Sequence, residues 1–239
     1  MYQLTIISAT IGDCFTLLVG PDEHVICVSR EWLCHNFKYF DMLAQRTHEA
    51  RFPDADPRCF EILLMYAFDD TLPPVDYSEV NGENKLSNNW DPFKLYQLAA
   101  TLGEPEFMDR ALQALRDGLA RKYLSLNLGD IDEGYTRSPP KSPMRRFLSY
   151  VVAYKLICTK SDQMGWTNFE VEQLCKKHPD LGCDIVPHMR RTKRVFPTNI
   201  WDVWPDCELH SHPEDGSCPY KKLDSPSESR IREWMALGF

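Results

Sequence analysis

The chain has 239 residues, of which 43% are hydrophobic, and its formal net charge is −8. This is long and apolar enough to bury one sizeable core or two small ones. No run of 18 apolar residues is present, so the sequence predicts no membrane span. The acidic excess lies in residues 1–140, where it disfavours nucleic-acid binding because phosphates would be repelled.

The nine cysteines follow no regular spacing, and the start of the chain lacks the basic residues of a secretion signal. An odd number of cysteines without such a signal favours reduced thiols. We therefore expect a cytoplasmic or nuclear protein.

The first elements predicted along the chain are a hairpin and two short helices. Residues 14–19 and 24–28 are β-prone runs separated by the turn residues 20–23. Residues 30–43 then carry apolar side chains at helical spacing. The segment therefore predicts a strand-turn-strand-helix unit.

Two further helical blocks are delimited by their caps. Asp56 predicts an N-cap, with Pro57 at the first helical position and the helix closed before residues 72–73. Gly103 predicts the left-handed end of a helix that begins near Leu95, and Pro105 the first turn of the next helix.

In their order and in their amino-acid sequence, these three blocks resemble a BTB/POZ domain, particularly the divergent form abundant in filamentous fungi. They read FTLLVGPDEHVICVSREWLCHNFKYFDMLA, DPRCFEILLMYAF and LYQLAATLGEPEF. The resemblance covers residues 10–123 and implies an α+β fold, in which a small β-sheet is flanked by a helical cluster. It also implies protein–protein interaction, either in assembly with another BTB protein or as the substrate-recruiting arm of a cullin ubiquitin ligase.

The resemblance implies a first set of partner-binding residues on the dimer side. The family's buried Asp and the basic residue after the second strand correspond to Asp13 and Arg30, a pair that helps to shape a pocket. The usual His before the basic residue is Ser29 here. Homodimerisation is left open by these matches.

A second set concerns cullin recruitment. Family members that bind a cullin carry a hydrophobic-x-Glu triplet, and the matching residues here are Thr47, His48 and Glu49. Glu49 is kept, whereas Thr47 replaces an apolar anchor whose burial would contribute about 1.5–3 kcal/mol. Cullin binding is therefore an open alternative.

The rest of the chain is divided by composition. The polar residues 73–92 predict a surface insertion within the first domain, and the Pro-rich residues 124–143 predict a linker. Residues 144–204 predict a helical extension, with amphipathic segments at 144–158 and 169–178. Residues 205–239 predict a tail that ends in a short helix.

The tail contains a candidate zinc site. Cys207, His210, His212 and Cys218 form C-x2-H-x-H-x5-C, and thiolate and imidazole are preferred zinc ligands. The alternative is a loop with two exposed histidines. A second set of possible ligands has knuckle-like intervals, but the apolar rhythm of the same stretch favours helices: Cys175, His178, Cys183 and His188.

Several functional alternatives remain. The chain lacks the familiar hydrolase, nucleotide-binding and zinc-protease motifs, so we expect no enzyme, although Glu208 and Glu214 could serve a metal-dependent one. A transcription-associated regulator would use the tail and the basic residues 190–194 on nucleic acid; otherwise these residues are a solvated helix end.

Large aromatic residues in the first domain are candidates either for the core or for an interface. We expect most of them to be core residues. They are Trp32, Phe37, Tyr39, Phe40, Tyr66 and Phe68.

Overall fold

The computed structural model describes residues 13–75, 77–80, 83–86, 90–122, 126–158, 166–191 and 209–211. These residues form five strands and nine helices. The α+β class predicted from the sequence is confirmed.

The main sheet has three strands in the order β2-β1-β3. β1 (Cys14–Val19) pairs antiparallel with β2 (His24–Ser29), as the hairpin prediction requires, and parallel with β3 (Glu49–Phe52). Alternate β1 residues point into the core: Phe15, Leu17 and Val19 are fully buried. The turn between β1 and β2 begins at Gly20, whose φ is 80°.

Three helices pack on this sheet. They are α1 (Arg30–Asn36), α2 (Lys38–Ala44) and α3 (Pro57–Asp69). Buried aromatic rings join them to the strands, with ring centroids 5.9 Å apart for Phe15 and Phe40 and 4.8 Å apart for Phe52 and Phe60. Edge-to-face and tilted ring pairs at these distances are favourable.

The caps predicted from the sequence are confirmed. The Asp56 carboxylate accepts from the backbone N–H of Arg58 at 2.9 Å and begins α3. Gly103 has φ 71° and ends α4 (Pro92–Leu102), and Pro105 begins α5 (Pro105–Lys122).

The predicted insertion contains a second, small sheet between α3 and α4. β4 (Tyr77–Val80) and β5 (Glu83–Leu86) pair antiparallel. Val75 and Trp90 lie on either side of this hairpin and are buried, so they anchor its ends to the core. The sequence did not predict these strands because the segment has a polar composition.

The prediction of a linker over residues 124–143 is wrong for most of its length. α6 (Leu128–Arg137) occupies it, and Ile131 and Tyr135 are fully buried against α4 and α7 (Pro143–Cys158). Ser138 and Ser142, which precede prolines, are also buried. This segment is part of the core, not an exposed connection.

Two further helices pair with α6 and α7 through polar contacts. α8 (Asn168–Lys177) and α9 (Pro179–Arg191) confirm the helical interpretation of the second candidate ligand set. His178 Nε2 lies 2.7 Å from Asp132 Oδ1, and the Tyr135 hydroxyl donates to Asp184 at 3.1 Å. The pKa of Asp132 is lowered because Lys177 and His178 bind its carboxylate, despite opposing desolvation.

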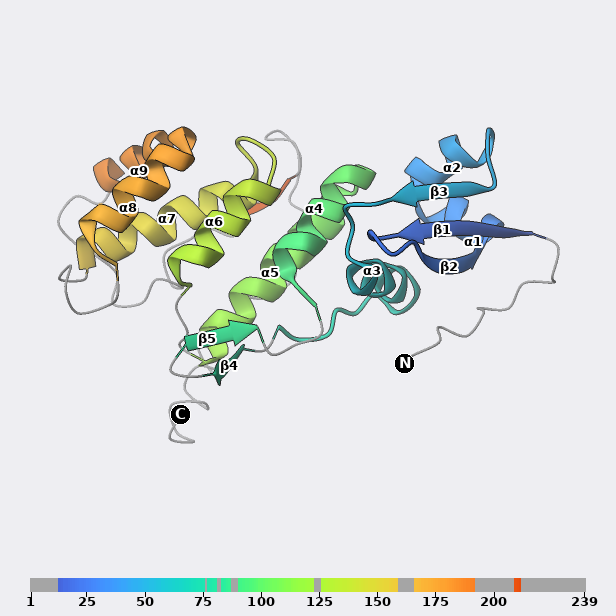
Figure 1. Ribbon diagram of the computed structural model, residues 1–239, viewed down its shortest axis with the longest axis horizontal. Helices are drawn as coiled ribbons and strands as arrows, with labels where there is room; N and C mark the ends of the chain where they lie inside the picture. Colours follow the sequence, from blue (N-terminus) through green and yellow to red (C-terminus); the bar gives the residue numbers. More distant parts are fainter. Residues whose placement is uncertain are drawn as a thin grey trace.

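Figure 1 shows the arrangement of these parts. The sheet and α1–α3 lie at one end, α4 and α5 run through the middle, and α6–α9 form the other end. One core of buried apolar residues extends through all three parts. No helix in the described part of the chain is long and apolar enough to cross a bilayer.

Candidate functional site

Arg30 lies at a corner where the first helix meets two strands. Its backbone N–H donates to the Asp13 carbonyl at 3.0 Å. Its guanidinium binds the Ala44 carbonyl at the end of α2 and lies 3.1 Å from His48 Nδ1. The structure therefore brings together three of the residues predicted for partner binding, Asp13, Arg30 and His48.

The contact between Asp13 and Arg30 is made through the backbone. Asp13 is exposed, whereas the resemblance implies a buried Asp at this position. The Ser29 side chain caps α1 by accepting from the Trp32 N–H at 3.4 Å. These contacts of Asp13, Ser29 and Arg30 do not form the pocket that the resemblance implies at the charged pair.

The residues of the predicted cullin triplet form the entry to β3. The Thr47 hydroxyl donates to the Glu49 carbonyl and accepts from the Glu49 N–H, both at 3.1 Å. The His48 carbonyl accepts from the Thr16 N–H at 2.9 Å. These bonds fix the backbone of the triplet, while the side chains of His48 and Glu49 remain exposed.

Arg51, which the sequence analysis did not select, links the triplet to the β1–β2 turn. Its guanidinium lies 3.1 Å from Glu49 and 2.7 Å from Glu23. All three side chains are about half exposed, so each ion pair contributes only about 0–1 kcal/mol. The Glu49 carboxylate can therefore exchange Arg51 for a partner at little cost.

A groove of about 270 Å³ opens beside β3. Its walls come from α2, β3, the turn after β3 and α4, and include Tyr39, Arg51, Leu98 and Thr101. Lys94 and Asp56 also line the groove and form an ion pair at 3.1 Å. This volume lies at the lower end of the range for small-molecule sites, which is about 300–1,000 Å³.

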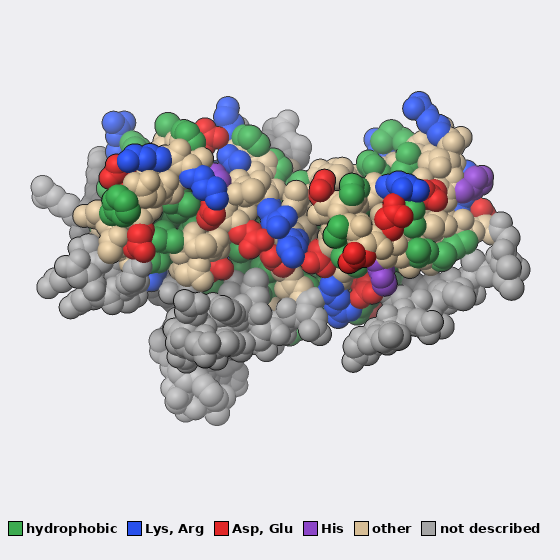
Figure 2. All heavy atoms as spheres, in the orientation of Figure 1, with side chains coloured by type: hydrophobic (Ala, Val, Ile, Leu, Met, Phe, Trp, Pro, Cys, Tyr) green, Lys and Arg blue, Asp and Glu red, His purple; other side chains and the backbone are tan. Residues whose placement is uncertain are grey.

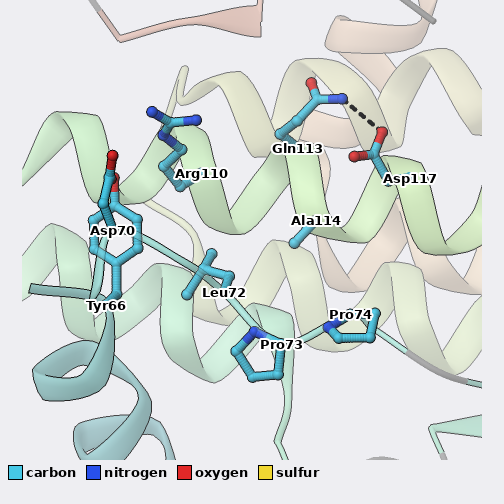
Figure 3. Close-up of a pocket in the computed structure, with 9 residues that line it drawn as sticks. All are labelled: Tyr66, Asp70, Leu72, Pro73, Pro74, Arg110, Gln113, Ala114 and Asp117. Atoms are coloured by element: carbon cyan, nitrogen blue, oxygen red, sulfur yellow. Dashed lines mark hydrogen bonds between the residues drawn. The ribbon is translucent and has the colours of Figure 1, made fainter. Parts of the chain in front are cut away.

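A second pocket of about 160 Å³ lies between the end of α3 and α5. Figure 3 shows Tyr66, Asp70 and Arg110 on one side of it, and Gln113 donating to Asp117 on the other. Burial raises the pKa of Tyr66 to about 12, so its hydroxyl stays protonated. This pocket is also small for a drug-sized ligand.

The predicted aromatic candidates divide between core and surface. Phe37 and Phe40 are buried, whereas Phe68 on α3 is 60% exposed. Met65, one turn earlier, is 41% exposed, and the rings of Trp32 and Phe68 lie 6.5 Å apart. We call Met65 and Phe68 of α3, together with Trp32 of α1 beside Phe68, the α3 apolar face.

Cys34 lies next to His35 on α1, and a cysteine and a histidine are the residue types of a thiol nucleophile and its base. The Cys34 thiol donates to the Phe40 carbonyl at 3.6 Å, while His35 is exposed. Burial, and then the charge of Asp41, raises the pKa of Cys34. A raised pKa disfavours the thiolate that a nucleophile needs.

Three of the four predicted zinc ligands lie outside the described residues: Cys207, His212 and Cys218. The fourth, His210, lies in the described segment 209–211. Within the described ranges, no three His, Cys, Asp or Glu residues are grouped as metal ligands. Of the basic residues 190–194, Arg190 and Arg191 end α9 and the others lie outside the described part.

Figure 2 shows how charge is distributed on one face of the molecule. Acidic and basic side chains are interspersed there, with exposed hydrophobic groups between them.

A scan against protein-family models and a search of curated proteins each found no match.

Proposed function

We propose that this chain is a BTB-type protein–protein interaction module. The order of elements in residues 14–122 supports the resemblance: a hairpin, two short helices, a third strand parallel to the first, and then α3, α4 and α5. The resemblance implied a small sheet flanked by a helical cluster, and this architecture agrees with it.

The observation that carries the proposal is the α3 apolar face. Fully burying a Phe or Met side chain contributes about 1.5–3 kcal/mol. Phe68 and Met65 keep roughly half of that surface in water, so a partner that covers them would gain about 2 kcal/mol in total. Exposed aromatic and Met side chains are enriched at interfaces.

Two forms of the proposal differ in the partner. In a cullin adaptor, Glu49 would leave Arg51 and bind the partner, with the neighbouring groove beside β3 contributing shape. In an assembly scaffold, another BTB protein or a second copy would cover the α3 apolar face. Both forms bind protein, and neither requires a metal or a small ligand.

Calorimetry with the amino-terminal region of a BTB-binding cullin tests the adaptor form. Glu49→Ala and Glu23→Ala are matched variants, because each removes one carboxylate that binds Arg51. We expect binding at a Kd of about 10 μM or tighter, lost in Glu49→Ala and kept in Glu23→Ala. Equal effects of the two substitutions, or no binding by the unmodified chain, would eliminate the adaptor form.

A further inference from the structure

A short segment near the end of the chain docks onto α5, about one hundred positions earlier in the sequence. Leu209 is 1% exposed and belongs to the main apolar core. The backbone N–H of Ser211 donates to both carboxylate oxygens of Asp109, at 2.9 and 3.0 Å. Two contacts therefore hold this segment: the buried Leu209 side chain and, two residues later, the charge-assisted hydrogen bond from Ser211 to Asp109.

Asp109 is a buried carboxylate, only 5% exposed. Burial of a carboxylate is costly unless hydrogen bonds compensate it. The Ser211 amide supplies such a bond, so removing the tail would leave Asp109 less well satisfied. The hydrogen bond from Ser211 therefore stabilises the buried charge of Asp109.

The dock lies where three helices meet. Burial raises the pKa of Tyr96, on α4, to about 12, and the charge of Asp109 adds to this effect. The Tyr96 hydroxyl accepts from the backbone N–H of Met144 at 3.4 Å, in the first turn of α7. A segment held at Asp109 thus sits at the junction between the sheet-bearing part of the chain and α7.

We propose that residues 209–211 act as an intramolecular latch, which occupies a peptide dock on α5 centred on Asp109. Recognition rests on a backbone amide and on the Leu209 side chain. Among the described residues, the buried Ser211 hydroxyl has no hydrogen-bond partner, so it makes no favourable contact with them. Release of the latch would expose the Asp109 carboxylate and the apolar seat of Leu209.

A contact of three residues suits a tethered segment. A free peptide of this size would pay the entropic cost of association, whereas the tail is already present at a high effective concentration. The latch can therefore be closed in the intact chain and still open with a modest perturbation. Opening and closing of the latch do not depend on the proposed partner-binding function.

The test compares two substitutions at one position in the full chain. Ser211→Pro removes the amide hydrogen that binds Asp109, and Ser211→Ala keeps it while removing the unsatisfied hydroxyl. The readouts are cleavage of the Glu208–Leu209 bond by a glutamate-specific protease and deuterium uptake at residues 209–210. Cleavage requires Leu209 to leave its seat, so its rate reports opening.

We expect Ser211→Pro to raise the cleavage rate at least tenfold, with faster deuterium uptake, while Ser211→Ala matches or falls below the unmodified rate. Asp109→Asn keeps the shape of the acceptor and removes its charge, and we expect a three- to tenfold increase. Circular dichroism checks that each variant is folded. Rates within twofold for Ser211→Pro and Ser211→Ala, or an unchanged rate for Asp109→Asn, would overturn the latch.

Discussion

The packing of α6 makes a specific prediction for Gly134→Ala. A Cβ at Gly134 would overlap Leu148 Cδ1 and lie 3.1 Å from Phe93 Cε1. Both neighbours are buried, on α7 and α4, so neither side chain has free space to enter. The substitution therefore tests whether α6 packs closely or lies on the surface, as the composition of a linker suggested.

The magnitude follows from two opposing effects. Ala is favoured over Gly inside a helix by about 1 kcal/mol, and overpacking of a core costs about 1–3 kcal/mol. The net effect is a loss of up to about 2 kcal/mol in the free energy of unfolding, with a fall in Tm of about 2–4 °C per kcal/mol, and the overlap with Leu148 places Gly134→Ala toward the upper end of this range.

Gly182→Ala is the matched control, because a Cβ at this position in α9 meets no atom of the described residues within 4 Å. We expect it to raise the free energy of unfolding by about 1 kcal/mol through helix propensity alone. Urea denaturation followed by circular dichroism measures both variants. If Gly134→Ala stabilised the chain as much as Gly182→Ala, the close packing of α6 would be refuted.

Three other predictions follow from burial and from the tail. Burial raises the pKa of Asp130 to about 6. Protonated Asp130 thus stabilises the fold fully below pH 4, which is near the pKa of Asp in the unfolded chain, and this stabilisation is lost as pH rises through 6. Asp130→Asn should raise stability at pH 7 by about 1 kcal/mol and flatten the profile from pH 4 to 6 in urea titrations; an unchanged profile would contradict this. Burial also raises the pKa of Cys59 to about 12, so maleimide labelling followed by mass spectrometry should modify Cys183 far faster; equal rates would disprove it. The zinc prediction requires about one zinc ion per chain by elemental analysis, lost in Cys207→Ser and Cys218→Ser, and zinc-free protein at saturating zinc would reject it.

Local signals in the sequence were sufficient for the first part of the fold. The β1–β2 hairpin, the Asp56 cap and the Gly103 helix end each depend on residues within a few positions of one another. Such features can be predicted from the sequence because the same short segment contains both the donor and the acceptor, or the turn and its strands.

Features that depend on distant partners could not be predicted in this way. α6 has few apolar residues, and Ile131 and Tyr135 become core residues only because α4 and α7 cover them. The approach of Arg30 to His48 joins positions 18 apart, and that of Ser211 to Asp109 joins positions 102 apart. No periodicity or spacing in the sequence specifies these contacts.

The most direct test of the central claim is sedimentation velocity of the full chain, alone and with the amino-terminal cullin region. Phe68→Ser alters the α3 apolar face, and Phe169→Ser is its control, because Phe169 on α8 is 67% exposed and lies outside that face. We predict either a self-associated species that Phe68→Ser weakens about tenfold and Phe169→Ser leaves unchanged, or a cullin complex that Glu49→Ala weakens. A monomer that binds nothing at about 100 μM, or self-association that the two Phe variants weaken equally, would contradict the proposed interaction module.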